Sequence, residues 1–412
     1  MEFIADLHIH SKYSRATSKN MDLENLSYWA KIKGIGLLAT GDFTHHLWIS
    51  QLKAQLKPQG DGLFKYKDTY FMLTAEVSSI YSKKGKTYRI HNLIFAPSFK
   101  TVERINKVLA GIGNIASDGR PILGLDAAKL AKIVFDIDER CFIVPAHVWT
   151  PWFSLFGSMS GFDRLKDCFE EQSSKIYCLE TGLSSDPAMN WRLSGLDKYC
   201  LISNSDAHSP QKIGREANVF DCELSYDDIT DTLKQKDKKR FLYTIEFFPE
   251  EGKYHFDGHR NCQVRFSPAE TKQHKGICPK CTKPLTVGVM NRVAALADRD
   301  CGYVPKDAIP FKNLIPLDEI IAEVKGISKT SKAVAKEYFS VIQRFGSEFE
   351  VLLKASDEKL NKFLPAKIAE AILKVRQGKV NIKPGFDGEF GQIKIFDAQE
   401  KEKGTEKQMN FF

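Results

Sequence analysis

The first 245 residues alternate short apolar runs with amphipathic stretches, and this alternation restricts the possible fold more than any other feature of the chain. Continuous runs of β-branched residues and Leu are typical of strands buried on both faces of a parallel sheet. The stretches between them, such as Asn20–Lys33 and Asp126–Phe135, have helical spacing. We therefore predict a barrel-like α/β fold with its functional groups at the carboxyl ends of the strands. The predicted strands are Phe3–Leu7, Ile35–Thr40, Phe71–Val77, His91–Phe95, Cys141–Pro145, Ile176–Glu180 and Leu201–Ser203.

The overall composition is that of a globular protein. The chain has 412 residues, 42% hydrophobic and 27% charged, which is long enough for two or three domains. No apolar run approaches the roughly 18–20 residues that cross a bilayer, and the first residues lack the basic and apolar regions of a secretion signal. Nine cysteines spread over a long chain indicate free thiols rather than a disulfide framework. We expect a cytoplasmic monomer without a membrane partner.

Charge is distributed unevenly along the chain. Residues 1–250 carry 32 Lys and Arg against 31 Asp and Glu, whereas residues 251–412 carry 28 against 21. Of the net charge of +8, +7 therefore lies in the last 162 residues. A basic segment of this kind favours contact with a polyanion. An ordinary lysine-rich surface is the alternative that charge alone leaves open.

Changes in composition divide the chain into four parts. They are an α/β part (1–247), a Cys/His-rich module (248–305), a helical part (306–397) and a charged tail (398–412). Within the third part, residues 314–378 carry Leu, Ile, Val and Phe at helical spacing. Residues 379–396 predict a β-hairpin, because alternating apolar residues flank the turn signal Asp387-Gly388.

Eight histidines and carboxylates fall at the ends of the predicted strands, where a barrel gathers its catalytic groups. His8 and His10 form an H-x-H pair, and Asp206 and His208 form a D-x-H pair. In extended backbone, residues i and i+2 share a face, so that each pair can point at one ion. Each residue alone could be a polar surface or capping residue, but the set predicts a metal centre. It comprises His8, His10, Asp42, Glu76, His91, His147, Asp206 and His208.

This mixture of imidazole and carboxylate suits zinc, manganese or iron, and a bridging carboxylate such as Glu76 would suit two or three ions. We expect Zn²⁺ at this centre, with Mg²⁺ or Mn²⁺ as alternatives. Clustered ions generate hydroxide near neutral pH and neutralise phosphoryl oxygens, which is the chemistry of phosphoester hydrolysis. The sequence has no G-x-x-x-x-G-K-[ST] loop and no dinucleotide fingerprint, so the substrate must supply its own phosphate.

The motifs H-I-H-S, G-D, A-E, H-N, P-A-H and S-D-A-H, in this order, resemble the PHP (polymerase and histidinol phosphatase) family of metal-dependent phosphoesterases. The resemblance implies a distorted seven-stranded β/α barrel, the (β/α)7 PHP barrel. Two positions depart from the family pattern. Phe43 stands where the family often has a second-motif His, and Tyr13 stands near the missing third His of the first motif. His45 or His46 could compensate, and the number of ions stays open.

A second metal site is predicted in the Cys/His-rich module. C-P-K-C is a knuckle whose two thiolates can converge on one tetrahedral ion, and an upstream H-x-x-C supplies a second pair. The predicted ligands of this structural Zn²⁺ are His259, Cys262, Cys278 and Cys281. His274 and His255 are less favoured as the fourth ligand. A redox role for the C-x-x-C pair would need a βαβ context that the surrounding sequence lacks.

The string K-Y-H-F-D-G-H-R-N-C, followed by G-I-C-P-K-C and L-T-V-G-V-M-N-R-V-A-A-L-A-D-R, is more specific than the knuckle. Together with the PHP motifs it resembles the endonuclease Q family of DNA-repair enzymes, from His8 to about Phe396. The resemblance implies nicking of double-stranded DNA on the 5′ side of deaminated bases (uracil, hypoxanthine, xanthine) or abasic sites. It also implies that the eight residues bind the catalytic metals, with Asp206, Glu76 and Asp42 as catalytic carboxylates, in a nucleoid-associated protein.

The helical part contains a pattern that resembles a helix-hairpin-helix, a motif that holds a DNA phosphate through turn amides and a helix N-terminus. In V-K-G-I-S-K-T-S-K-A-V-A the tight turn falls at Gly326. A second, degenerate copy is predicted at L-P-A-K-I-A-E-A-I. Lys329, Lys332 and Lys367 are the residues expected near phosphates. The alternative for both copies is an ordinary pair of packed helices.

Two further segments suggest partners. The aromatic run after His147 offers Trp149 and Trp152 as residues that stack on a lesion base, although such runs more often belong to a core. The last residues resemble the bacterial sliding-clamp-binding peptides, which bury an apolar end in a groove of the clamp. The alternative is a tail that packs on its own protein. The clamp-binding candidates are Gln408, Met409, Phe411 and Phe412.

These features predict a metal-dependent, lesion-specific DNA endonuclease. Two other classes remain open from the sequence. One is a PHP-type phosphatase for small molecules, which would need neither the zinc module nor the helical part. The other is a DNA-binding clamp accessory protein with an inactive barrel, against which the eight intact ligand candidates argue.

Overall fold

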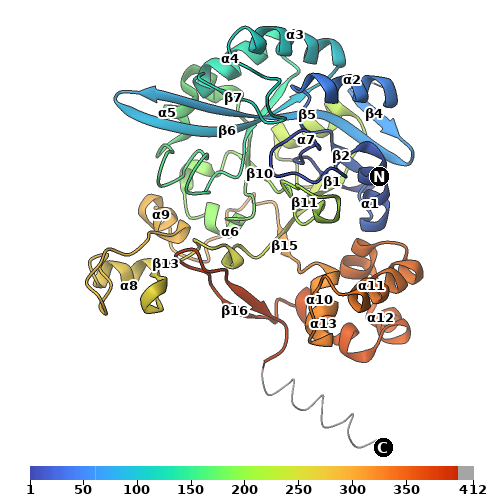
Figure 1. The fold of residues 1–412 in the computed structure, drawn as a ribbon, viewed down its shortest axis with the longest axis vertical. Coiled ribbons are helices and arrows are strands. Elements are labelled where there is room, and N and C mark those ends of the chain that lie inside the picture. The colour runs from blue at the N-terminus through green and yellow to red at the C-terminus, as the bar shows by residue number, and fades with distance from the viewer. Residues whose placement is uncertain (61, 398–412) are drawn as a thin grey trace, which may run out of the picture.

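The computed structural model describes residues 1–60 and 62–397, with a large mixed sheet at its centre (Figure 1). The sheet order is β15-β12-β11-β1-β2-β5-β4-β3, with β6 and β7 paired to β5, and β8 paired to β6. The strands are β1 (Glu2–Asp6), β2 (Leu37–Ala39), β3 (Lys57–Pro58), β4 (Leu63–Tyr66), β5 (Thr69–Lys83), β6 (Lys86–Ala96), β7 (Ile122–Leu123), β8 (Phe142–Pro145), β11 (Ala217–Asp221), β12 (Phe241–Glu246) and β15 (Phe311–Asn313). A separate parallel pair comprises β9 (Cys178–Glu180) and β10 (Cys200–Ile202).

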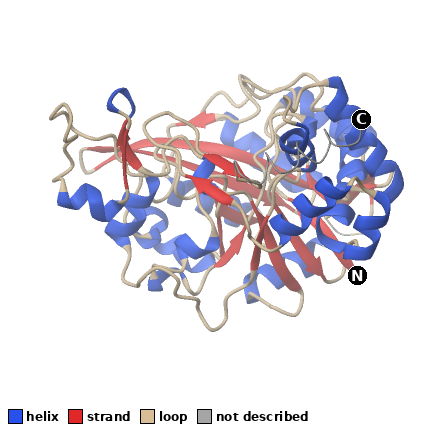
Figure 2. Cartoon of the chain, turned by 90° about the horizontal axis from the view of Figure 1, so that it is seen from below, coloured by secondary structure: helices blue, strands red, loops and turns tan. Residues whose placement is uncertain are grey.

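Helices surround these strands, which gather in the middle of the molecule (Figure 2). The α-helices of this part are α1 (Leu23–Lys33), α2 (His46–Gln55), α3 (Phe99–Ala110), α4 (Ala127–Ile137), α5 (Leu165–Phe169), α6 (Pro187–Asn190) and α7 (Tyr226–Gln235). Short 3₁₀ segments lie at Glu170–Lys175, Ser194–Leu196, Pro210–Lys212, Pro249–Glu251 and Arg260–Cys262. The α/β prediction is thus confirmed, including helices over the two predicted amphipathic stretches.

All seven predicted strands exist, but the prediction that they are parallel is wrong for β6, which runs opposite to both of its neighbours. β1 runs parallel to β2, and β2 runs parallel to β5. β6, which contains His91–Phe95, is antiparallel to β5, and β8, which covers most of Cys141–Pro145, is antiparallel to β6. The reason is the tight turn at Lys84-Gly85, both with positive φ, because so short a connection can only join antiparallel strands.

The Cys/His-rich module and the helical part lie on one side of the sheet (Figure 1). The module contains β13 (Asp257–His259), β14 (Val264–Phe266), α8 (Pro268–Gln273) and α9 (Val289–Leu296). The helical part contains α10 (Leu317–Lys325), α11 (Lys332–Phe345), a π-helical turn (Glu350–Lys354), α12 (Asp357–Phe363) and α13 (Ala366–Arg376), then β16 (Asn381–Lys383) and β17 (Gln392–Lys394). No helix among the described residues is both long and apolar enough to cross a membrane.

The predicted β-hairpin is confirmed. β16 and β17 are antiparallel, with Ile382 opposite Ile393. Asp387 and Gly388 have φ of 44° and 87°, and Phe386 and Glu389 exchange backbone hydrogen bonds around them. Two consecutive positive φ values are what a type I′ turn requires, which explains the Asp-Gly sequence.

A buried ion pair joins the helical part to helix α1 of the α/β part. Lys33, in the last turn of α1, lies 2.7 Å from Glu348, and the two side chains are 7% and 3% exposed. Glu348 also accepts hydrogen bonds from Leu317 N–H and Tyr338 O–H, at 3.0 and 2.6 Å. Burial alone would raise the pKa of Glu348, but Lys33 and these hydrogen bonds outweigh it and lower the pKa.

We predict that Glu348→Ala lowers the free energy of unfolding by about 3–5 kcal/mol, because it leaves the Lys33 ammonium buried without its partner. Urea denaturation followed by circular dichroism at pH 7 measures this loss. Since the folded-state pKa of Glu348 lies below its ordinary value, the contribution is present above that value and is lost as the pH falls. The difference between the two proteins should therefore shrink in acid.

The matched control is Glu350→Ala, because Glu350 pairs with Lys359 at 3.8 Å on the surface. It should change stability by no more than about 1 kcal/mol. Equal effects of the two substitutions would contradict an anchoring role for Glu348.

Candidate functional site

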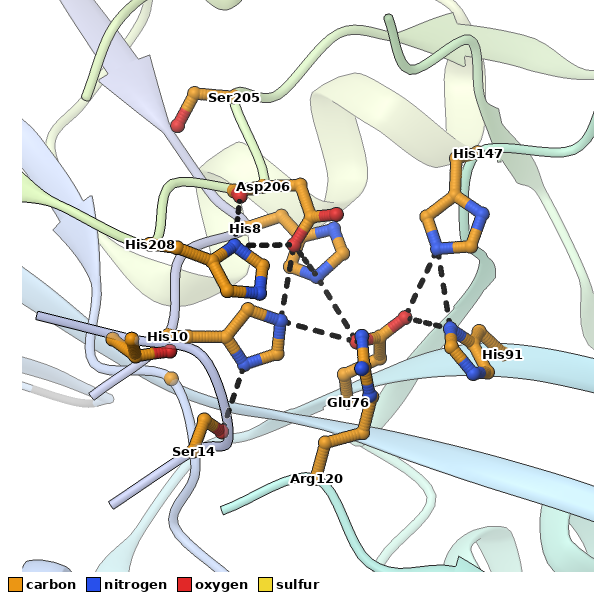
Figure 3. Close-up of polar contacts among 12 residues, drawn as sticks. His8, His10, Ser14, Glu76, His91, Arg120, His147, Ser205, Asp206 and His208 are labelled. Atoms are coloured by element: carbon orange, nitrogen blue, oxygen red, sulfur yellow. Dashed lines mark hydrogen bonds and ion pairs between the residues drawn. The ribbon is translucent and has the colours of Figure 1, made fainter. Parts of the chain in front are cut away.

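Five of the eight predicted ligands form two groups with a sixth, Glu76, and His208 lies beside them (Figure 3). Asp42 contacts His10 from outside both groups. His8 and His10 follow β1, His147 follows β8, and Asp206 follows β10. The prediction that every one of them stands at a strand end is wrong for Glu76 and His91. Glu76 lies well inside β5 and His91 well inside β6, because the hairpin of these two strands extends past the site to Lys83 and Lys86.

Three of the loop residues have unusual backbone conformations. Asp42, His147 and Asp206 have φ of 49°, 31° and 48°, although none of them is glycine. Left-handed backbone at such residues costs about 1–2 kcal/mol each, and it persists where the surrounding structure holds a side chain in a required direction. In all three residues the side chain is turned toward the histidine–carboxylate cluster.

Two groups of ligand atoms share one carboxylate. His8, His10, Glu76 and Asp206 form the first group, and Glu76, His91 and His147 form the second, with the ligand atoms of each group within 4.8 Å of one another. Glu76 Oε1 lies 2.6 Å from His91 Nδ1 and 3.1 Å from His147 Nε2. Its Oε2 lies 3.2 Å from His10 Nε2. Glu76 therefore offers one oxygen to each group, as a carboxylate shared by two ions would.

The first group contains buried polar atoms that converge without forming well-aligned hydrogen bonds. His8 Nε2, His10 Nε2 and Asp206 Oδ1 have no hydrogen-bond partner within the described residues, although Asp206 Oδ1 lies 3.0 Å from His10 Nε2 and 3.6 Å from His8 Nε2. Buried polar atoms without partners are costly, so their convergence needs an explanation. Imidazole nitrogens and carboxylate oxygens together are donors suited to a divalent ion, and the residues present fit such an ion.

Two carboxylates outside the ligand groups orient His10 and His8. Asp42 lies outside both ligand groups: its Oδ1 accepts from His10 Nδ1 at 3.0 Å, and its Oδ2 accepts from Ser11 and Ser14. Glu180 does the same for His8, at 3.0 Å from Nδ1, and it also accepts from His147 N–H. Each carboxylate fixes the tautomer that turns Nε2 toward the cluster.

Sequence reasoning missed Glu180, although a signal was present. Glu180 is the last residue of β9, a predicted strand, so it occupies the kind of position in which the sequence predicts metal ligands. His208 lies beside the first group rather than in it, with Nδ1 donating to the Asp206 carbonyl at 2.8 Å. His45 stacks on Tyr13 at 4.5 Å, so neither it nor His46 replaces the absent family histidine within the ligand groups.

The charges of the cluster favour cation binding. Burial would raise the pKa of Glu76, but His91, His8 and Arg120 outweigh it and hold the pKa well below its usual range. The pKa of Asp206 is also lowered, against the effect of burial, chiefly by His8 and His10. Burial lowers the pKa of His91 to about 4, so that its imidazole is neutral near pH 7. Burial would lower the pKa of His8, His10 and His147, but the neighbouring carboxylates outweigh it and raise the pKa, so an ion that binds these imidazoles displaces their protons.

The predicted zinc ligands also converge. One ligand atom from each of His259, Cys262, Cys278 and Cys281 lies within 4.8 Å of the others. Burial would raise the pKa of the Cys278 thiol, but the backbone N–H groups of Lys280 and Cys281 lower it, which favours thiolate. His255 and His274 lie outside this group, His274 being stacked on Phe266.

The two tryptophans have different surroundings. The proposal that Trp149 stacks on a base is wrong, because it is 1% exposed and its indole N–H donates to Asn190 at 2.7 Å. Trp152 is 45% exposed, with the Arg89 guanidinium 5.1 Å from its ring centroid. Its neighbour Phe153 packs against His91 at 4.9 Å, which places Trp152 next to the ligand groups.

The loop that carries Trp152 is braced by the Cys/His-rich module. Arg292 in α9 donates to the Phe156 and Phe162 carbonyls at 3.0 and 3.1 Å. The start of α9 is in turn held by Asp257, which accepts from Gly288 N–H and from Asn291, each at 2.6 Å. Asp257 lies in β13, two residues before the predicted zinc ligand His259.

The turn between α10 and α11 fits the first predicted hairpin. Gly326 has φ of 65° and nothing lies within 4 Å of where its Cβ would be, so the turn is open to a partner. Lys329 pairs with Glu319 at 2.8 Å, and Lys332 opens α11. The second copy differs, because α12 and α13 are joined by Leu364-Pro365 without a glycine. Lys367 there pairs with Glu370 at 3.1 Å.

Comparison with known proteins places this arrangement in a family. The model of the MJ0043 C-terminal domain matches residues 316–379. Uncharacterized protein YqxK of Bacillus subtilis is 30% identical over 95% of this chain and 98% of its own length. Uncharacterized protein MJ0043 of Methanocaldococcus jannaschii is 35% identical over 60% of this chain, and the match spans only 31% of that protein.

Two crystal structures are similar over nearly the full length. The lesion-specific endonuclease PfuEndoQ of Pyrococcus furiosus has a TM-score of 0.87 and 33% identity, covering 98% of this chain and 99% of that one. An Endonuclease Q in complex with a 27-mer duplex carrying an abasic lesion has a TM-score of 0.85 and 34% identity, covering 97% and 98%. Fold and site therefore define a metal-binding nuclease. The chain belongs to the endonuclease Q family.

We predict that replacing Cys278 and Cys281 together by Ser removes one zinc ion per chain, because thiolate ligands hold structural zinc far better than hydroxyls do. Inductively coupled plasma mass spectrometry of the purified protein measures the metal content. Cys301→Ser is the matched control, since Cys301 is exposed and lies outside the ligand group. Unchanged zinc content in the double variant would exclude this site.

Proposed function

We propose that the chain is a DNA-repair endonuclease that nicks the phosphodiester 5′ to uracil, hypoxanthine, xanthine or an abasic site. The observation that carries this proposal is the pair of ligand groups joined by Glu76, in a chain similar over nearly its whole length to lesion-specific endonuclease Q. Hydrolysis at this position leaves a 3′-hydroxyl and a 5′-phosphate.

The metals would be held by His8, His10 and Asp206 on one side of Glu76 and by His91 and His147 on the other. Divalent ions bound there supply hydroxide near neutral pH and neutralise charge on the phosphodiester. Asp42 and Glu180 keep His10 and His8 in the orientation that turns Nε2 toward the ligand groups. His208, the remaining predicted ligand, lies beside them. Zn²⁺ is the proposed ion, with Mg²⁺ or Mn²⁺ as alternatives.

We further assign the barrel to the PHP type and the module at residues 248–305 to a zinc-binding domain. The order of the ligand motifs along the chain supports the first assignment, and the convergence of His259 with three cysteines supports the second. Neither assignment depends on which ion occupies the catalytic centre.

The basic C-terminal part would hold the duplex on either side of the lesion. The open turn at Gly326 precedes the N-terminus of α11, whose amides and Lys332 are suited to a backbone phosphate. Lys329 and Lys367 would extend this contact. Phosphate contacts of this kind position DNA without reading its sequence, which suits an enzyme that must act at lesions in any sequence.

Trp152 is the proposed stacking residue for the lesion. An enzyme that acts at one base must extrude it or act beside it, and damaged pairs are easier to open than intact ones by a few kcal/mol. Trp152 is exposed, is supported by Arg89 and lies next to the ligand groups through Phe153. The proposed clamp-binding residues, Gln408, Met409, Phe411 and Phe412, lie outside the described residues.

The function predicts nicking of a duplex that contains one uracil, one inosine or one abasic site, in the presence of Zn²⁺, Mg²⁺ or Mn²⁺. A 5′-labelled strand resolved on a denaturing gel gives the position of the nick, expected immediately 5′ to the lesion. The undamaged duplex of the same sequence should stay intact.

Asp206→Ala is the catalytic control, because it removes the carboxylate ligand that the first group does not share with the second. It should abolish nicking while the protein still binds the duplex. Equal cutting of damaged and undamaged DNA would refute lesion specificity. Turnover of p-nitrophenyl phosphate without any nicking would instead identify a small-molecule phosphatase, and duplex binding without either activity would identify an inactive accessory protein.

A further inference from the structure

One cation at the centre is not explained by metal binding. Arg120 extends to Glu76, where Nη1 donates to Oε2 at 3.1 Å. Its side chain is 30% exposed, whereas that of Glu76 is 1% exposed, so Arg120 is in contact both with solvent and with the buried carboxylate. Figure 3 shows the guanidinium beside Glu76. Among the described residues, no other Lys or Arg forms an ion pair with Glu76 or Asp206.

The loop that presents Arg120 is built against the metal-ligand loops. Gly119 donates its N–H to the Tyr13 carbonyl at 3.1 Å and accepts from the Thr44 hydroxyl at 3.0 Å. A Cβ at Gly119 would lie 2.3 Å from Asp42 Oδ2 and 2.4 Å from Ser14 Oγ, so only glycine fits. Asp118 closes the loop by accepting from Arg120 N–H at 3.1 Å. The position of Arg120 is therefore fixed by the same elements that hold His10.

The guanidinium has more donors than Glu76 uses. The contact with Glu76 occupies Nη1, while Nε and Nη2 form no hydrogen bond with the described residues. A planar guanidinium with free donors at the mouth of a metal centre is suited to the paired oxygens of a phosphate. The negative charge on those oxygens has to be stabilised as the phosphodiester is attacked, and preorganised donors lower the barrier for that step.

We propose that Arg120 is a catalytic residue that binds a non-bridging oxygen of the scissile phosphate while it stays against Glu76. This inference rests on the proposed hydrolysis of a phosphoester at this site, and it adds the protein group that recognises the phosphate. The contrasting role, in which Arg120 only balances the charge of Glu76, would make it necessary for the metal centre rather than for the phosphate.

The test compares wild type, Arg120→Met and Arg120→Lys in the metal-loaded full chain. Three quantities are measured: metal ions per chain by mass spectrometry, affinity for inorganic phosphate by isothermal titration calorimetry, and the single-turnover rate of nicking of the uracil duplex. Arg15→Met is the matched control, because Arg15 is 77% exposed and pairs with Asp118 two residues from Arg120.

For Arg120→Met we expect unchanged metal content, phosphate affinity at least about 10-fold weaker, and a nicking rate lower by about 100- to 1,000-fold, the usual loss on removing one such donor. Arg120→Lys should recover part of both losses, since it keeps the charge but not the fork of donors. Arg15→Met should match wild type. Loss of metal in Arg120→Met, or unchanged phosphate affinity, would overturn the proposal.

The phosphate measurement separates this proposal from the function it rests on. If wild type fails to nick any lesion duplex, the proposed endonuclease function fails. The proposed role of Arg120 is then still tested by phosphate affinity and metal content, because neither measurement requires DNA. Nicking by wild type together with full phosphate affinity in Arg120→Met would sink the role of Arg120 alone.

Discussion

The carboxylate of Glu76 is the contact on which the site depends. One of its oxygens faces His91 and His147, and the other faces His10 and Arg120. The side chain is buried and ionised, which is stable only because cationic and ligating groups surround it on both sides. Every strand and loop that reaches the centre brings a group that either contacts this carboxylate or orients one that does.

The rest of the chain holds elements around that centre. The Lys33–Glu348 pair joins the helical part to α1 within a shared apolar core, so that the Gly326 turn has a fixed position relative to the α/β part. On the other side, Arg292 and Asp257 connect the Cys/His-rich module to the loop of Trp152. Both C-terminal parts are thus attached to the α/β part by buried or half-buried polar contacts.

Local spacing made much of this predictable from sequence. The H-x-H pair, the two Cys/His pairs and the Asp-Gly turn each act over a few residues, and the structure brings their residues together. Of the D-x-H pair, only Asp206 lies in a ligand group. Strand direction was not predictable from apolar runs, because β6 is buried like a parallel strand although the turn at Lys84-Gly85 makes it antiparallel. Trp149 and Trp152 differ in burial only through contacts such as that with Asn190, which is distant in sequence. Arg120 lies in a loop without periodicity and could be found only in three dimensions.

The most direct test of the central claim is anomalous diffraction from crystals loaded with Mn²⁺. We expect two peaks at the centre, one on each side of Glu76, with His10 and Asp206 at the first and His91 and His147 at the second. A single peak served by only one of these groups, or peaks that do not touch Glu76, would contradict it.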